Sequence, residues 1–263
     1  MTSTGAVGLT DMDALLEGKN AVVYGAGGAI GGAVARAFAK EGARVYLAGR
    51  TPSSLEAVAA DIRSGGGTAE TAVVDALDER AVDEHARGVV AQAGSLDVSM
   101  NLISHGDVQG TPLAEMAVDD FLRPVVTAVR TTFLTVRAAA RHMTVQRSGV
   151  ILLFGGDGPP LRGYSLGGLQ VAFTALETMR RQLSSELGPA GIRVVTLRTA
   201  GIPETLGDFA GSDEIFGDIE RATMLGRAAT LEDVGNAAVW AASDRARVMT
   251  AATINISAGS LID

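Results

Sequence analysis

Short apolar runs alternate with stretches of helical periodicity along almost the whole chain. The apolar runs are rich in Val, Ile and Leu and are bounded by glycine or polar residues, which is typical of buried strands. They predict strands within residues 20–24, 43–49, 69–76, 95–106, 149–156, 191–201 and 251–257. Apolar residues recurring three and four positions apart predict helices within residues 29–42, 53–67, 78–94, 128–143, 169–187 and 231–244.

This alternation predicts one α/β domain built on a doubly wound parallel sheet. Residues 1–16 form a loose, polar lead-in, and the domain occupies residues 17–263. A domain boundary near residue 150 is the alternative, but strands and helices keep alternating through that point. Residues 203–225 form a connection rich in acidic side chains, with a few aromatic and aliphatic residues among its glycines. We interpret this connection either as a solvated surface or as a lid that excludes water from a site.

A glycine-rich turn follows the first predicted strand. The stretch GAGGAIG places Gly25, Gly27, Gly28 and Gly31 between that strand and a helix that starts near Ala29. Glycines at such a turn let the backbone approach a pyrophosphate, and the helix N-terminus offers unpaired N–H groups and a partial positive charge. We interpret the turn as a dinucleotide-binding site; a tight turn with a purely structural role is the alternative.

The composition argues against several other classes of protein. The 22 basic and 30 acidic residues give a net charge of −8, whereas a nucleic-acid surface needs clustered basic residues, so we expect a small-molecule substrate. The chain contains no apolar run of 18 residues and no secretory signal pattern, which predicts no membrane span and a cytoplasmic location. It has no cysteine and three scattered histidines, so we expect no metal site.

From about Leu16 to Gly259, the chain resembles the short-chain dehydrogenase/reductase family, which implies a Rossmann-type fold. The glycine-rich turn is similar to the family motif Thr-Gly-x-x-x-Gly-Ile-Gly, with Gly25, Ile30 and Gly31 matching. Tyr24 replaces the threonine and Ala29 replaces the central glycine of that motif. The resemblance implies a nicotinamide cofactor, a mobile substrate loop at residues 203–225, and a homodimer or homotetramer.

The resemblance also implies further cofactor contacts. Arg50 stands at the end of the second strand, where enzymes selective for NAD usually carry an acid, so NADP(H) is preferred over NAD(H). A solvated loop arginine is the alternative. Asp75 matches the family's adenine-contacting aspartate, and Asn101 begins a degraded Asn-Asn-Ala-Gly motif. Gly201 and Thr205 match a Pro-Gly-x-x-x-Thr motif, in which the threonine contacts the nicotinamide amide.

The family's catalytic tetrad falls on four positions that carry no suitable side chain. The alignment of residues 169–195 puts the catalytic tyrosine at Leu169 and the lysine four residues later at Phe173. The serine falls on Gly156 and the asparagine on Ala128. The chain has only two lysines, both within its first 40 residues, so no shift of this alignment restores the lysine.

Three polar residues are candidate replacements for the missing proton donor. His105, which Asp107 and Gln109 follow closely, comes directly after the fourth strand, where open α/β sheets bind ligands. Tyr164 and Asp157 flank the position of the missing serine. Structural hydrogen bonds or ordinary packing are the alternatives for these residues. The remaining histidines, His85 and His142, are expected on helix surfaces away from the site.

Three functions remain open on the sequence alone. The first is an NADP(H)-dependent oxidoreductase that reduces a carbonyl or an imine or iminium group, with a substituted proton donor, because hydride transfer mainly requires a nicotinamide held against an electrophilic carbon. The second is a non-redox lyase, isomerase or cyclase on the same scaffold. The third is a pseudoenzyme that binds the cofactor without chemistry, since fold alone does not fix function.

Overall fold

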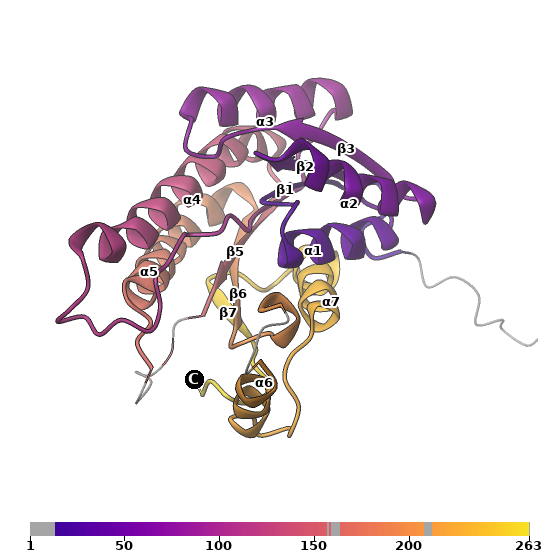
Figure 1. The fold of residues 1–263 in the computed structure, drawn as a ribbon. Coiled ribbons are helices and arrows are strands. Elements are labelled where there is room, and N and C mark those ends of the chain that lie inside the picture. Colours follow the sequence, from indigo (N-terminus) through magenta and orange to yellow (C-terminus); the bar gives the residue numbers. More distant parts are fainter. Residues whose placement is uncertain (1–13, 157, 159–163, 208–211, 263) are drawn as a thin grey trace, which may run out of the picture.

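A computed structural model describes residues 14–156, 158, 164–207 and 212–262 of the chain. Seven parallel strands form one sheet in the order β3-β2-β1-β4-β5-β6-β7 (Figure 1). The strands are β1 (Asn20–Tyr24), β2 (Arg44–Gly49), β3 (Thr68–Val73), β4 (Val98–Asn101), β5 (Gly149–Gly155), β6 (Ile192–Thr199) and β7 (Ala252–Ile256). The order reverses between β1 and β4, which is the switch point where doubly wound sheets bind ligands.

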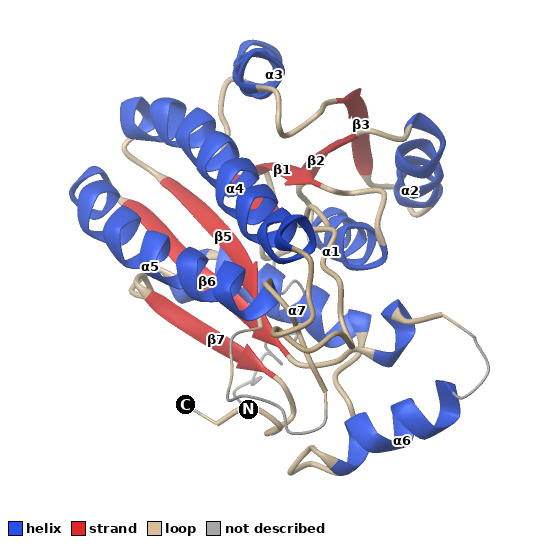
Figure 2. Cartoon of the chain, turned by 60° about the vertical axis from the view of Figure 1, so that its left-hand side comes forward, coloured by secondary structure: helices blue, strands red, loops and turns tan. Residues whose placement is uncertain are grey.

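Helices cover both faces of this sheet (Figure 2). The helices are α1 (Ala29–Lys40), α2 (Pro52–Ser64), α3 (Glu79–Ala93), α4 (Val118–Gln146), α5 (Leu169–Leu187), α6 (Ser212–Arg221) and α7 (Leu231–Ala242). One core joins α1, α2 and α7 to the sheet, and a second core joins α3, α4 and α5 to its other face. The prediction of a single doubly wound α/β domain is confirmed.

Helix α4 is longer than the predicted segment 128–143, because it begins ten residues earlier despite an internal Pro124. Asp119 and Asp120 lie in its first turn, where negative charge favours the positive end of the helix dipole. Gly168 lies so close to the Phe121 carbonyl that it has no room for a side chain. The chain that leads into α5 therefore packs closely against the part of α4 that precedes Pro124, where proline removes one backbone donor.

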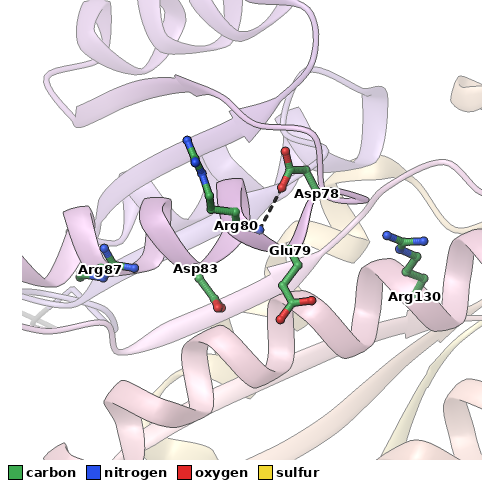
Figure 3. A pocket seen from close by; sticks show the side chains of 6 residues that line it. All are labelled: Asp78, Glu79, Arg80, Asp83, Arg87 and Arg130. Carbon is green, nitrogen blue, oxygen red and sulfur yellow. Dashed lines mark hydrogen bonds between the residues drawn. The ribbon is translucent and has the colours of Figure 1, made fainter.

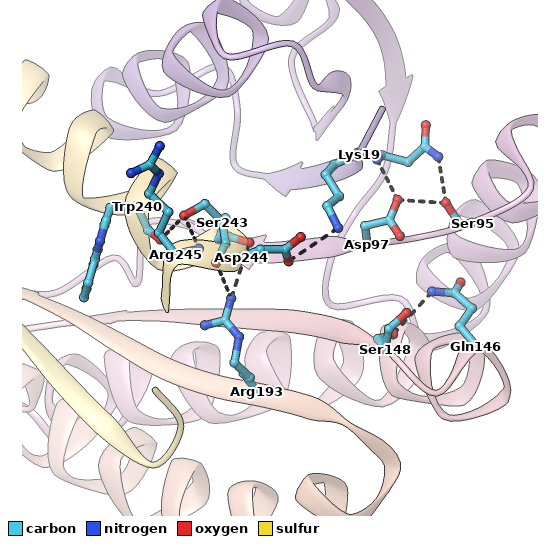
Figure 4. A network of polar contacts seen from close by, with 12 residues as sticks. Lys19, Ser95, Asp97, Gln146, Ser148, Arg193, Trp240, Ser243, Asp244 and Arg245 are labelled. Atoms are coloured by element: carbon cyan, nitrogen blue, oxygen red, sulfur yellow. Dashed lines mark hydrogen bonds and ion pairs between the residues drawn. The ribbon is translucent and has the colours of Figure 1, made fainter. Parts of the chain in front are cut away.

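Polar contacts fix the amino ends of the strands, on the side opposite the glycine-rich turn (Figure 4). Asp97 accepts hydrogen bonds from the backbone N–H of Asn20 (2.8 Å) and from the hydroxyl of Ser95 (2.7 Å). Arg193 donates to the carbonyl of Ser243 at 3.1 Å. These contacts tie β4 to β1 and β6 to the end of α7, so they support the sheet rather than a reactive site.

Candidate functional site

The glycine-rich turn lies at the carboxyl edge of the sheet and is packed too closely for side chains. Gly25 has φ of 77°, and a Cβ at this position would overlap the Leu102 carbonyl. A Cβ on Gly31 would overlap the Gly25 carbonyl. Glycine is therefore required at both positions, because the turn after β1 lies directly against the first turn of α1 and against the loop that follows β4.

The same turn leaves the start of α1 open to an anion. Gly28 is the N-cap residue of α1 and has no side chain to bond the first N–H groups of the helix. Gly27, Gly28 and Ala29 are exposed. A Cβ on Gly27 would lie 2.9 Å from the Cβ of Ser54, so the start of α2 borders the turn. Exposed, uncapped N–H groups at a helix N-terminus fit a phosphate.

Arg50 and Asp75 lie at the neighbouring strand ends, as expected. Arg50 is exposed after β2 and makes no ion pair with any residue that the structure describes. It is followed by α2, whose N-cap residue Thr51 contributes no side-chain hydrogen bond. The Asp75 carboxylate accepts a hydrogen bond from the backbone N–H of Leu77 at 3.0 Å and remains exposed. Sequence reasoning missed Ser54, although the Thr-Pro-Ser-Ser run after Arg50 is a helix-start signal.

Asn101, at the end of β4, is buried and has protein partners for its whole side-chain amide. Its Nδ2 donates to the hydroxyls of Thr131 and Thr132 in α4, both at 3.1 Å. Its Oδ1 accepts a hydrogen bond from the backbone N–H of Ile103 at 3.1 Å. The Asn101 side chain therefore holds the loop after β4 against α4. It can influence the binding of a cofactor by positioning this loop.

Apolar side chains meet where the resemblance puts the catalytic tetrad. Ala128 of α4 is fully buried in a small cluster with Ala172 and Leu176 of α5, against which Phe173 packs. A Cβ on Gly156 would lie 2.9 Å from the Thr199 carbonyl oxygen and 3.3 Å from the Phe173 ring. The aromatic ring therefore occupies space beside the end of β5, and a serine does not fit at Gly156 without rearrangement.

His105 lies against that aromatic ring. The two ring centroids are 5.8 Å apart, with an angle of 65° between the planes, which is an edge-to-face arrangement. Burial lowers the pKa of His105 below its ordinary value, and the carboxylate of Asp107 partly opposes this effect. The imidazole is therefore mostly neutral at pH 7 and can accept a proton, while its protonated form is a stronger acid than an exposed imidazolium.

Tyr164 makes no ring contact and no hydrogen bond with Phe173 or His105, but hydrogen bonds link it to the loop after β4. Its hydroxyl donates to Oε1 of Gln109 at 3.0 Å, and Nε2 of Gln109 donates to Oδ2 of Asp107 at 2.6 Å. The Tyr164 side chain is 51% exposed. The structure thus links Tyr164 to the loop that carries His105, whereas Asp157 lies outside the described residues.

The loop after β6 and helix α6 close another side of the carboxyl edge. The Thr205 hydroxyl donates to the Ile202 carbonyl at 2.8 Å within a short 3-10 turn. A Cβ on Gly201 would lie 2.9 Å from the side chain of Ile219 in α6. The predicted loop 203–225 thus contains a helix that packs against Gly201. Residues 208–211 within it lie outside the description.

His85 lies on α3 as expected but is only partly exposed, because its ring packs against Tyr24. Its ring lies edge-on to Tyr24, with centroids 5.7 Å apart, and its Nδ1 is 3.4 Å from the Tyr24 hydroxyl. Burial lowers the pKa of His85 to about 4, and burial together with Asp83 raises the pKa of Tyr24. The helical pattern missed this contact because it depends on the tyrosine that replaces the motif's threonine. His142 is partly buried on α4.

We expect replacement of His85 by glutamine to flatten the pH dependence of stability between pH 4 and 6.5. The folded-state pKa lies below the unfolded value of about 6.5, so stability is present above pH 6.5 and is lost as the pH falls toward 4. The loss at this group is on the order of 3 kcal/mol in the free energy of unfolding. Urea titrations from pH 4 to 7 measure it, with His142→Gln as the control. An unchanged slope in His85→Gln would contradict the argument.

A charged groove lies between α3 and α4 (Figure 3). Its lining residues are Asp78, Glu79, Arg80, Asp83, Arg87 and Arg130. Arg137 pairs with Glu79 at 2.7 Å, and Arg141 pairs with Asp83 at 2.8 Å. These ion pairs join the two helices, and the mixed charges give the groove no preference for an anion. We therefore assign it no role in the site.

The described part of the chain contains no helix that is long and apolar enough to cross a membrane. The same residues hold no cluster of three or more His, Cys, Asp or Glu side chains suited to a metal ion. The candidate site is therefore built from backbone N–H groups, an imidazole and apolar side chains, at least within the described ranges.

A doubly wound parallel sheet with an open glycine-rich turn at its switch point defines the class of dinucleotide-binding α/β proteins. A family model described as enoyl-(acyl carrier protein) reductase matches residues 25–260. The chain belongs to the short-chain dehydrogenase/reductase family of oxidoreductases.

Individual relatives agree over nearly the full length. The chain is 30% identical to secoisolariciresinol dehydrogenase of Forsythia intermedia over 98% of this chain and 94% of that protein. It is 27% identical to D-threitol dehydrogenase of Mycolicibacterium smegmatis, over 96% of each chain. Among solved structures, a short-chain type dehydrogenase/reductase from Mycobacterium marinum is similar, with a TM-score of 0.83, 27% identity and coverage of 93% of this chain and 96% of that one.

Proposed function

We propose that this protein is an NADP(H)-dependent oxidoreductase that reduces a carbonyl or an imine or iminium group of a small molecule, with His105 in place of the family's tyrosine. The observation that carries the proposal is the edge-to-face contact of His105 with Phe173, in the loop whose Leu102 carbonyl lies against Gly25 of the glycine-rich turn. It brings a titratable group to the site of hydride transfer that the family resemblance implies.

The residues at the carboxyl edge suit a nicotinamide dinucleotide. When bound, the nicotinamide supplies or accepts the hydride. The N–H groups at the start of α1, around Gly28 and Ile30, would hold the diphosphate, and Asp75 would contact the adenine. The loops carrying Asn101 and Thr205 would lie beside the nicotinamide. These roles follow the family motif, and the tight packing at Gly25 and Gly31 supports the first of them.

The preference for NADP(H) rests on Arg50. Its exposed guanidinium, with no ion-pair partner among the described residues, can pair with a 2′-phosphate in a bidentate contact. The start of α2 adds uncapped N–H groups beside it, because Thr51 makes no side-chain cap. Both features favour an additional phosphate over a bare ribose.

We expect Arg50→Glu to weaken NADPH binding by about 10- to 100-fold, which corresponds to the loss of one charge-assisted contact of about 1.5–3 kcal/mol. NADH binding should change little, since NADH carries no 2′-phosphate. Fluorescence titration of both cofactors gives the two dissociation constants, and Arg44→Glu on the same strand is the charge-matched control. Equal losses for NADPH and NADH would refute a specific role of Arg50.

In the reduction, the protonated imidazole of His105 would give its proton to the oxygen or nitrogen of the group that is reduced. In the reverse direction, the neutral imidazole accepts the hydroxyl or amine proton. Phe173, Leu169 and the buried Ala128 supply no proton, and Gly156 has no hydroxyl to orient the substrate. The apolar wall excludes water and suits an apolar substrate, while an iminium group needs no proton at all. Tyr164 and Asp157 are the other candidate donors.

We also propose that the protein is a homodimer or homotetramer in the cytoplasm. Helices α4 and α5 expose large apolar side chains, namely Val126, Phe133 and Val171, which are between 46% and 55% accessible. Such a patch favours burial against a second copy. Light scattering should therefore give a mass of at least twice that of one chain, and a monomer at micromolar concentration would count against this assembly.

A cofactor and substrate screen tests the function as a whole. NADPH and NADH are titrated first, and a panel of aldehydes, ketones and cyclic imines is then followed at the nicotinamide absorbance. Cofactor oxidation coupled to product formation supports the proposal. Substrate conversion without a redox change in the cofactor would indicate a lyase, isomerase or cyclase. Tight cofactor binding without conversion of any compound would favour a pseudoenzyme, which the apolar cluster around Phe173 would also suit.

A further inference from the structure

Two loops meet beside His105 and are fixed to each other. One follows β4 and carries residues 102–117, and the other leads into α5. The Gly110 N–H donates to the Ser165 carbonyl at 2.7 Å. A Cβ on Gly167 would lie 2.6 Å from the Val108 carbonyl oxygen. The loops are thus in backbone contact at two points, and a side chain anchored in one can control the other.

A chain of side-chain hydrogen bonds crosses between these loops. The Tyr164 hydroxyl donates to Oε1 of Gln109 at 3.0 Å, which fixes the orientation of the amide. The Nε2 of Gln109 then donates to Oδ2 of Asp107 at 2.6 Å. Gly106, with φ of 69°, turns the backbone between Asp107 and His105. The Asp107 carboxylate, at the end of this series of hydrogen bonds, raises the pKa of His105 and so partly opposes the effect of burial.

The other groups around His105 leave Asp107 as the principal charge. From α5, the neighbour is the uncharged ring of Phe173. From α4, the aliphatic part of Arg123 lies beside Gly106, and its guanidinium pairs with Asp120 at 2.7 Å. Among the described residues, Asp107 is therefore the carboxylate beside His105 that has no ion-pair partner. The hydrogen bond from Gln109 fixes the orientation of this carboxylate.

We propose that Asp107, Gln109 and Tyr164 form one positioning chain for His105, in which the tyrosine orients the glutamine and the glutamine orients the aspartate. Tyr164 is then a positioning residue rather than the proton donor. The chain sets how readily His105 holds a proton, and it couples that property to the contact between the two loops. This inference rests on the proposed role of His105, but its test requires no turnover.

The test is an NMR titration of the three histidines, with the His105 signal assigned by its loss in His105→Gln. Asp107→Asn should shift the His105 midpoint to lower pH, because the opposing negative charge is lost. Tyr164→Phe and Gln109→Leu should shift it in the same direction by a smaller amount. In the Asp107→Asn background, Tyr164→Phe should have no further effect, because its influence passes through the carboxylate. Tyr46→Phe is the control, since Tyr46 lies in β2 and not in either of the two loops that carry His105 and Tyr164.

Three results would overturn the proposal. One is an unchanged His105 midpoint in Tyr164→Phe. Another is an equal shift from Tyr164→Phe with and without Asp107. The third, in a protein shown to be active, is a collapse of kcat in Tyr164→Phe while the His105 midpoint stays fixed, which would make Tyr164 the donor. If the screen finds no redox activity but the titrations behave as described, the proposed function fails and the positioning chain stands.

Discussion

Replacement of His105 by glutamine is expected to slow the catalysed reaction by about 10²- to 10⁴-fold, the usual contribution of a general acid or base. Glutamine keeps the side chain polar and similar in reach, but it cannot exchange a proton near pH 7. The dissociation constant of NADPH should stay nearly unchanged, because the imidazole contacts Phe173 rather than the glycine-rich turn. The loss should therefore appear in kcat for a ketone or aldehyde.

The pH dependence gives this prediction a second measurement. Reduction requires the protonated imidazole, so its rate should fall as the pH rises through the lowered pKa of His105. Oxidation requires the neutral form and should rise over the same range. Both dependences should vanish in His105→Gln, while His142→Gln keeps them. A preformed iminium substrate should be affected little. An unaltered kcat for a ketone would exclude His105 as the proton donor.

Replacement of Gly31 by alanine is expected to weaken cofactor binding by about 10²-fold or more. The added methyl group would overlap the Gly25 carbonyl, so either the start of α1 or the turn after β1 has to move. Contacts between N–H groups and a phosphate are worth about 1.5–3 kcal/mol each, so displacement of one or two of them accounts for the loss. Overpacking should also lower the free energy of unfolding by about 1–3 kcal/mol.

Gly88→Ala is the matched control for this variant. Gly88 lies in α3, and nothing approaches within 4 Å of the position that its Cβ would take. Because alanine is the better helix former, this change should stabilise the protein by about 0.5–1 kcal/mol and leave cofactor binding unchanged. Isothermal titration and urea unfolding of both variants separate affinity from stability. If Gly31→Ala bound NADPH with wild-type affinity, close contact between the glycine-rich turn and the cofactor phosphates would be ruled out.

Much of the fold follows from local patterns. The position of α1 after the glycine-rich turn and the extent of α5 match the sequence prediction, because both helices have strong apolar periodicity and clear ends. The early start of α4 and the helix within residues 203–225 were not predicted. In α4 the local signal is weakened by Pro124, and this part of the helix packs against Gly168. Local propensity does not include such contacts.

The candidate site divides in the same way. The sequence by itself determined the glycine-rich turn after the first strand, the arginine after the second strand and the absence of any lysine from the second half of the chain, because residue types and spacing limit those features. Only the tertiary structure decided that the ring of Phe173 lies against His105, that Tyr164 reaches Asp107 through Gln109, and that His85 packs edge-on against Tyr24. Each of these contacts joins residues far apart in the chain, and the contacts set the protonation of the histidines and of Tyr24. A local sequence pattern encodes neither the contacts nor their effect on protonation.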